Sequence, residues 1–254
     1  MIVVENLTKQ YENTTAVNNV SIEVKEGENL VLLGTSGSGK TTTLRMINRL
    51  IEPTSAEVFI NGKSIFTQPA EILRRGIGYV LQHTGLFPHY TVAENIALVP
   101  HLLQWQKKLV KKRTVALMEK LQLPPGKYLD AYPDQLSGGQ QQRVGLARAL
   151  AADPPILLMD EPFGALDPIT RSGIRKEFRA LDDLNKKTVI LVTHDVQEAF
   201  ELGDRICLMD DGKIVQQGTP ADLLFHPVNG FVKHFLSEQR LLVALFELTE
   251  RREQ

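Results

Sequence analysis

The sequence predicts an α/β fold in which helices cover a mostly parallel sheet, and three observations support this class. Continuous apolar runs at 30–34, 155–161 and 188–194 alternate with helical stretches, which is typical of buried parallel strands. Near the N-terminus, "MIVVENL" and "NVSIEV" alternate apolar and polar residues instead, so we expect an antiparallel β layer beside the main sheet. From about Thr84 to Leu136 the strand signal is absent, which indicates helices.

The stretch without strands divides the chain. We interpret residues 84–136 as a helical subdomain inserted into an α/β core that is formed by residues 1–83 and 137–254. Within the insertion, residues 107–123 have an amphipathic helical pattern that ends at Pro124, because proline cannot continue a helix. The amphipathic C-terminal segment is expected to fold as a helix onto its own domain.

Composition and charge exclude several classes of protein. The chain has 254 residues, 43% of them apolar, so it can bury a sizeable core. Its formal net charge is −1, and no general positive field would hold it on nucleic acid. Cys207 is the only cysteine, which excludes an internal disulfide. The start resembles no secretory signal, and the apolar cluster at 241–246 is far shorter than the roughly 20 residues of a membrane-spanning helix. We expect a chain that is soluble by itself.

A glycine-rich motif, "GTSGSGKTT", follows a predicted buried strand and precedes a predicted helix. There, glycines let backbone N–H groups converge on phosphate oxygens, and the helix N-terminus adds partial positive charge. We expect Lys40 to reach the β- and γ-phosphates of a nucleotide, Thr41 to bind Mg²⁺ and Thr42 to contact the α-phosphate. The alternative is a glycine-rich turn without a ligand. The rest of the predicted phosphate loop consists of Gly34, Thr35, Ser36, Gly37, Ser38 and Gly39.

Polar side chains end three other predicted strands. Asp160 is placed to bind Mg²⁺, whereas Glu161, one residue further, points in another direction and is our candidate general base for water. His194 is placed to bond the γ-phosphate or the attacking water. Gln82 is suited to sense Mg²⁺ or water, because an amide both donates and accepts hydrogen bonds. Each residue alone also has a structural alternative, such as a salt bridge at a strand end.

A second glycine turn raises a different question, because the chain already contains one phosphate loop. Ser137, Gly138, Gly139 and Gln140 lie within "LSGGQQQRVGLARAL" and open a predicted helix. Taken by themselves, these residues predict only a serine-capped helix N-terminus.

Together, these motifs closely resemble those of the nucleotide-binding subunit of an ABC transporter, in the family's order and over nearly the whole chain. The resemblance implies a RecA-like P-loop nucleoside triphosphatase core that uses ATP and Mg²⁺. It implies that Tyr11 stacks on adenine and that Asp167, in the loop 165–167, belongs to the nucleotide site. It also implies a head-to-tail homodimer, in which Ser137 and Gly139 of one chain cap the γ-phosphate held by the other.

The absence of a predicted channel makes the chain resemble an importer subunit at the cytoplasmic face of the inner membrane. Such a subunit works with separate integral membrane permeases and an extracytoplasmic substrate-binding protein. Two stretches, 41–55 and 77–105, resemble ATPases that serve uptake of glycine betaine, choline or carnitine. Many of these relatives continue into a regulatory domain pair that this sequence does not show. Ala56 stands where the family usually has glycine, so we expect a strained turn there if its φ is positive.

Other functions remain open from the sequence. A P-loop kinase or GTPase is one, although neither needs the turn at 136–140. Two more lie within the ABC family. One is an importer ATPase for another small solute, such as an amino acid. The other is an ABC protein of repair or translation that acts on nucleic acid, although such chains usually carry two P-loop domains or a long coiled coil.

Overall fold

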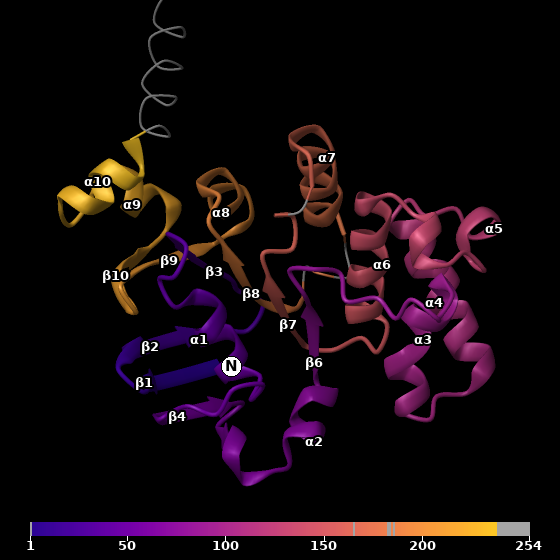
Figure 1. Cartoon of the computed structure of the whole chain (residues 1–254), viewed down its shortest axis with the longest axis horizontal. Helices are drawn as coiled ribbons and strands as arrows, with labels where there is room; N and C mark the ends of the chain where they lie inside the picture. Colours follow the sequence, from indigo (N-terminus) through magenta and orange to yellow (C-terminus); the bar gives the residue numbers. More distant parts are fainter. Residues whose placement is uncertain (1, 165, 182–183, 185, 238–254) are drawn as a thin grey trace, which may run out of the picture.

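The fold is built from two sheets with helices between and around them (Figure 1). The computed structural model describes residues 2–164, 166–181, 184 and 186–237. The larger sheet has six strands in the order β10-β9-β3-β8-β7-β6, and the smaller has four in the order β2-β1-β4-β5. The predicted α/β class is confirmed. The C-terminal segment 238–254, for which we predicted a helix, lies outside the described residues.

The larger sheet is mostly parallel, as the apolar runs predicted. β3 pairs in parallel with β8 and β9, and β7 pairs in parallel with β6 and β8, whereas β10 pairs antiparallel with β9. The strands are β3 (Asn29–Gly34), β6 (Ile77–Val80), β7 (Ile156–Asp160), β8 (Thr188–Thr193), β9 (Arg205–Asp210) and β10 (Lys213–Gly218). Because β3, β6, β7 and β8 run in the same direction, their carboxyl ends meet at one edge of the sheet.

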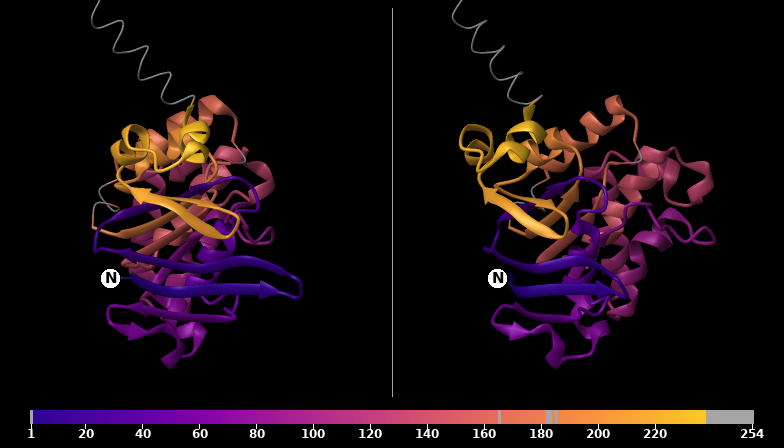
Figure 2. Two further views of the ribbon diagram at one scale, coloured as in Figure 1. Left: turned by 90° about the vertical axis from the view of Figure 1, so that its left-hand side faces the viewer. Right: turned by 60° about the vertical axis from the view of Figure 1, so that its left-hand side comes forward.

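The smaller sheet confirms the predicted antiparallel layer. β1 pairs antiparallel with both β2 and β4, and β5 extends β4 as a short hairpin. Figure 2 shows β1 and β2 as the two long strands of this layer. The strands are β1 (Ile2–Tyr11), β2 (Thr14–Val24), β4 (Ser55–Ile60) and β5 (Lys63–Ser64).

The condition for strain at Ala56, a turn with positive φ, is not met. Ala56 lies inside β4 and is not among the residues with positive φ. The left-handed residues of the following hairpin are Asn61, with φ of 52°, and Gly62, with φ of 73°. An Asn-Gly pair suits such a turn, because both residues tolerate positive φ.

Alternation along the strands divides the core into two clusters. Leu30 and Leu32 of β3 join the apolar face of the smaller sheet in one cluster, and Val31 and Leu33 join the second cluster on the opposite face. Helix α1 (Lys40–Ile47) lies between the two sheets and contacts strands of both. Both faces of β3 are therefore buried, which explains its continuous apolar sequence.

A group of helices packs beside the edge of the larger sheet that ends in β6. In Figure 1 these helices, α3 to α6, gather on the opposite side of β6 and β7 from the smaller sheet. They comprise α3 (Val92–Leu102), α4 (Lys107–Lys120), α5 (Pro125–Tyr128), the short 3₁₀ helix η2 (Pro133–Gln135) and α6 (Gly138–Leu150).

The remaining helices lie around the core. They are the 3₁₀ helix η1 (Ile65–Thr67) and the α-helices α2 (Ala70–Arg75), α7 (Pro168–Arg179), α8 (Val196–Leu202), α9 (Pro220–Phe225) and α10 (Gly230–Phe235). Among the helices in the described part of the chain, none has the length and apolar character needed to cross a membrane.

Candidate functional site

The glycine-rich motif forms the loop between β3 and α1. Gly39, directly before α1, has φ of 96°, and a Cβ atom on it would lie 2.5 Å from the carbonyl oxygen of Ala16. A Cβ on Gly34 would collide with the carbonyl oxygen of Met209. Only glycine therefore fits at both ends of the loop, which explains the motif at these two positions.

Lys40 holds its ammonium group inside this loop. Its Nζ donates to the carbonyl oxygens of Thr35, at 2.6 Å, and Gly34, at 3.0 Å. The side chain is almost fully buried, and burial lowers the pKa of Lys40, while the carboxylates of Glu161 and Asp160 act in the opposite direction. The lysine is thus positioned at the loop and near both acidic residues.

The start of α1 suits an anion. Thr35, Ser36 and Gly37 are exposed on the loop, Ser38 is buried in it and Thr42 is half-buried in the first helical turn. No side chain in the described part of the chain caps α1, and the helix has no acidic residue in its first turn. The N–H groups of that turn are therefore free of side-chain acceptors, and a phosphate group would satisfy them.

Asp160 meets Thr41 across the gap between β7 and α1. The hydroxyl of Thr41 donates to Oδ1 of Asp160 at 2.6 Å. The other oxygen, Oδ2, lies 3.5 Å from Nη2 of Arg45 and 3.5 Å from the hydroxyl of Tyr79. Burial raises the pKa of Tyr79, and the Asp160 carboxylate adds to that shift. Two oxygen ligands that suit Mg²⁺ are thus placed side by side.

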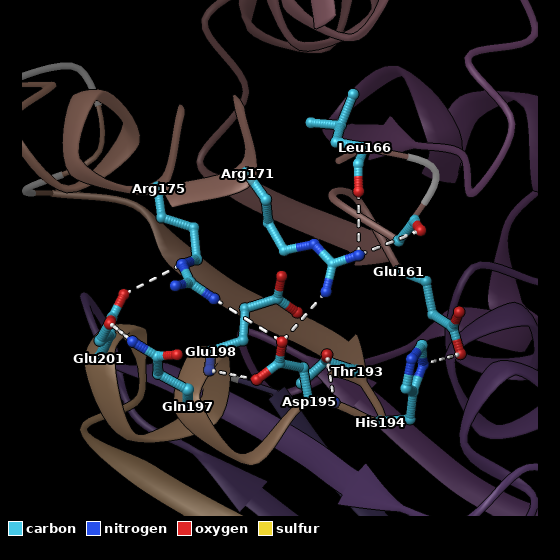
Figure 3. A network of polar contacts seen from close by, with 11 residues as sticks. Glu161, Leu166, Arg171, Arg175, Thr193, His194, Asp195, Gln197, Glu198 and Glu201 are labelled. Carbon is cyan, nitrogen blue, oxygen red and sulfur yellow. Dashed lines mark hydrogen bonds and ion pairs between the residues drawn. The ribbon is translucent and has the colours of Figure 1, made fainter. Parts of the chain in front are cut away.

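Glu161 is the centre of a second group of contacts, at the end of β7. Its Oε2 accepts a hydrogen bond from Nε2 of Gln82 at 3.0 Å, and its Oε1 lies 3.2 Å from Nδ1 of His194. The contact with His194 is visible in Figure 3. The structure therefore brings together three of the predicted residues, which follow β6, β7 and β8.

The second glycine turn begins α6 and is capped by its own side chains. The backbone N–H of Ser137 donates to Oε1 of Gln140 at 2.9 Å, and the backbone N–H of Gln140 donates to the Ser137 hydroxyl at 3.4 Å. Nε2 of Gln140 also donates to the hydroxyl of Tyr128 at 2.9 Å. Gly138 is exposed and Gly139 half-buried. Within this chain, the turn is separated from the phosphate loop, since α6 packs on α3, α4 and α7 while α1 lies between the sheets.

Two predicted residues lie apart from these groups of contacts. Tyr11 ends β1 with its side chain 45% exposed, and Nζ of Lys9 lies 4.9 Å from its ring centroid. Asp167 caps α7 by accepting a hydrogen bond from the N–H of Thr170 at 3.1 Å. Hydrogen bonds from Thr170 lower the pKa of Asp167. Ala165, in the same predicted loop, lies outside the described residues.

The sequence did not indicate the residues that hold the loop after Gln82. Arg148 of α6 donates to the carbonyl oxygens of Gly85 and Thr84, both at 2.7 Å. Asn95, fully buried on α3, exchanges hydrogen bonds with the backbone of Phe87. A polar residue inside an apolar helical stretch is a signal that could have identified Asn95.

Arg45 and Tyr79 were also missed as partners of Asp160. Arg45 stands four residues after Thr41 on α1, so both side chains project from one helix face. That spacing could have indicated Arg45, whereas Tyr79 reads only as a strand residue.

The phosphate loop lies at the same edge of the larger sheet as the buried Asp160 and the adjacent Glu161. This arrangement defines the class of P-loop nucleoside triphosphatases. A family model described as "ABC transporter" matches residues 17–164. The chain belongs to the ABC transporter family, as an ATP-binding cassette.

Several similar proteins are named as ATP-binding proteins of transport systems for choline, glycine betaine or carnitine. Choline transport ATP-binding protein OpuBA of Bacillus subtilis (strain 168) is 49% identical over 100% of this chain and 67% of its own length. Glycine betaine/carnitine/choline transport ATP-binding protein OpuCA of the same organism is 50% identical over 95% of this chain and 64% of its own length. Glycine betaine uptake system ATP-binding protein YehX of Escherichia coli (strain K12) is 49% identical over 98% of this chain and 80% of its own length. The chain thus spans about two thirds of the length of the two Bacillus proteins.

A solved structure supports the fold. The dimeric structure of MJ0796, a bacterial ABC transporter cassette, has a TM-score of 0.78 and 37% sequence identity to this chain. The match covers 87% of this chain and 99% of that cassette. The same cassette was also solved as a dimer in a post-hydrolysis state bound to ADP and Pi.

Proposed function

We propose that the chain is the ATP-hydrolysing subunit of an importer for quaternary-amine osmoprotectants such as glycine betaine, choline or carnitine. The observation that carries the hydrolytic part is the position of Glu161, whose carboxylate contacts both Gln82 and His194 beside the phosphate loop. The names of these three relatives support the solute class. An importer for another small solute remains the alternative.

Binding of ATP would use groups that the structure holds in place. Tyr11, exposed at the end of β1, would stack on adenine. The loop from Gly34 to Gly39 and the first turn of α1 would bind the phosphates through backbone N–H groups, with Lys40 at the β- and γ-phosphates. Thr41 and Asp160 would hold Mg²⁺, and Gln82 would sense it. The ion would neutralise charge on the phosphate oxygens.

Hydrolysis requires a group that accepts a proton from the attacking water. Glu161 is the candidate general base, because its carboxylate is close enough to act on the pKa of Lys40 and has two neighbours that orient it. His194 contacts one carboxylate oxygen and Gln82 the other, so rotation of the carboxylate is restricted. His194, with its side chain 54% exposed, is also accessible to the γ-phosphate of bound ATP.

The second glycine turn would complete the site of another copy. Ser137 and Gly138 are exposed at the start of α6, where the turn is capped by its own side chains. In a head-to-tail homodimer, Ser137, Gly138, Gly139 and Gln140 would cap the γ-phosphate of the partner, with Asp167 nearby. The dimeric structures of MJ0796 support this arrangement.

A groove beside the loop that follows Gln82 suits contact with a permease. The groove has a volume of about 360 Å³, and exposed or half-buried apolar side chains, among them Leu50, Leu81, Phe87 and Leu98, line it. It lies where the proposed helical subdomain, residues 84–136, meets the proposed core. We propose that this face binds a separate membrane permease at the cytoplasmic side of the inner membrane, and that the permease receives its solute from an extracytoplasmic substrate-binding protein.

Reconstitution tests the proposal. The chain, its candidate permease and binding protein would be placed in liposomes, and ATP-dependent uptake of labelled choline, glycine betaine, carnitine and proline would be measured. We expect uptake of at least one quaternary amine, abolished by Glu161→Gln. Uptake of proline alone would replace the quaternary-amine assignment with an amino-acid one, and ATP hydrolysis without any transport would contradict the importer.

A further inference from the structure

One arginine joins the segment after Glu161 to the segment after His194. Arg171, in the second turn of α7, donates from Nη2 to the carbonyl oxygen of Leu166 at 3.0 Å. Its Nη1 lies 3.2 Å from Oδ2 of Asp195. Figure 3 shows the guanidinium between these two partners. The arginine thus fixes the distance between two loops that lie far apart in the sequence.

Asp195 is itself held firmly, which makes it an effective anchor. Its Oδ1 accepts a hydrogen bond from the N–H of Glu198 at 3.1 Å, so it caps α8, and its own N–H donates to the hydroxyl of Thr193 at 3.0 Å. Asp195 directly follows His194, which contacts Glu161. A displacement of Asp195 would therefore move the backbone of the histidine.

These contacts form a closed ring. From Glu161 the chain runs to Leu166, Arg171 joins Leu166 to Asp195, the peptide bond leads to His194, and His194 returns to Glu161. We propose that Arg171 is a positioning residue for hydrolysis, which holds His194 against Glu161 through Asp195 without touching the nucleotide. The inference rests on the proposed function, in which Glu161 is the general base.

The neighbouring arginine has a different position. Arg175 is 4% exposed, and its Nε lies 3.0 Å from Oε2 of Glu201 while its Nη1 lies 3.7 Å from Oδ2 of Asp195. It therefore braces α7 against α8 and makes no contact with the loop at Leu166 among the contacts of the described residues. Arg171 is the one of the two that reaches this loop, and a lysine could not imitate its planar fork.

Steady-state ATP hydrolysis by the full chain provides the test. We expect Arg171→Met to lower kcat about tenfold or more, while KM for ATP stays within about twofold, because bound ATP is unaffected and only the orientation of the base is lost. Arg179→Met, which removes an exposed guanidinium from the same helix, is the matched control and should leave both constants unchanged. Arg171→Lys should retain only part of the activity.

A double-mutant cycle separates positioning from general stability. Asp195→Asn keeps an oxygen that can cap α8 but removes the charge that pairs with Arg171. If Arg171 acts through Asp195, the variant carrying both Arg171→Met and Asp195→Asn should be no slower than the slower single variant. Thermal unfolding midpoints of all variants are measured alongside. If Arg171→Met does not fold, the kcat of Arg171→Lys tests the positioning role in its place.

Several results would overturn the inference. The first is a kcat of Arg171→Met that stays within about twofold of the parent, or the same result for Arg171→Lys where Arg171→Met does not fold. The second is a raised KM with unchanged kcat. The third is a double variant in which the losses of the two single variants multiply. An active parent with an equally active Arg171→Met would refute only the positioning role. A parent that does not hydrolyse ATP, alone or with its permease, would refute the proposed function and this inference with it.

Discussion

Oε1 of Glu161 lies 3.2 Å from Nδ1 of His194, although the two residues follow different strands. The imidazole and the carboxylate are therefore within reach of each other at the edge of the larger sheet. The backbone of Glu161 is left-handed, with φ of 43°, which costs on the order of 1 kcal/mol or more in a residue other than glycine. Its N–H donates to the carbonyl oxygen of Val192 at 2.9 Å and holds it in this conformation. The carboxylate is thus directed to the edge where the phosphate loop lies.

Replacement of Glu161 by glutamine tests the general base. The amide has the same shape but cannot take a proton from water, so we expect turnover to fall roughly 10²- to 10⁴-fold. Binding of ATP should be retained, and the variant should accumulate as an ATP-bound dimer. Hydrolysis rates and nucleotide retained after gel filtration are the measurements. Turnover within about threefold of the parent would show that Glu161 is not the base.

If each ATP site is formed by the phosphate loop of one chain and the glycine turn of its partner, two inactive variants should complement each other. Lys40→Ala removes the phosphate-binding ammonium, and Ser137→Arg blocks the glycine turn, so each homodimer carries two defective sites. A heterodimer places both defects in one site and leaves the other intact. Mixing the variants under conditions of subunit exchange should restore one trapped nucleotide per dimer.

The control for that experiment is each variant alone, which should trap none. Ser137→Arg also loses a helix cap, a change of about 1 kcal/mol that should leave the chain folded. Heterodimers that form but trap no nucleotide would show that the turn at Ser137 serves only as a cap.

The groove at Phe87 predicts a variant that uncouples transport. Phe87 is 47% exposed and lines the groove, whereas Leu86 packs against the core, so Phe87 is the better position to change. Phe87→Glu should reduce ATP-driven uptake in reconstituted liposomes at least about tenfold, with basal hydrolysis of the isolated chain retained, because a charge in an apolar contact is costly. Phe225→Glu, at an exposed position on α9, is the control. Equal loss of uptake and hydrolysis would indicate a folding defect and contradict the docking role.

A buried carboxyl predicts a dependence of stability on pH. Glu198 is 2% exposed, and burial raises its pKa to about 7 from an ordinary value of 4.5. The Asp195 carboxylate adds to the shift, and the Thr193 hydroxyl, Arg175 and Arg171 oppose it. Because the folded state holds this proton more tightly than the unfolded state, the contribution of Glu198 to stability falls as pH rises from about 4.5 to about 7.

Replacement by glutamine should remove that loss. Glu198→Gln mimics the protonated side chain, so its free energy of unfolding should exceed that of the parent by about 1 to 3 kcal/mol at pH 8 and match it near pH 4. Urea unfolding at the two pH values measures the difference, with the exposed Glu71→Gln as control. A difference between parent and variant that does not change with pH would contradict the raised pKa.

Much of the fold could be predicted because it is encoded locally. The run at 188–194 predicted β8 (Thr188–Thr193), and the motif at Gly34 placed the loop between a strand and a helix. At Ala56, a family pattern suggested a turn, whereas the residue lies in a strand. The pattern of apolar residues indicates that a strand is buried, but it does not indicate at which residue the strand begins or ends.

By itself, the sequence determined that Lys40 begins the helix after the phosphate loop and that Asp160 and Glu161 stand at a strand end, because strand direction and motif spacing are local properties. Only the tertiary structure decided which distant groups meet them. Tyr79 reaches Asp160 because β6 and β7 are neighbours in the sheet. Arg171 reaches Asp195 because α7 packs against α8, and such side-chain partners depend on helix packing, which has no local signature in the chain.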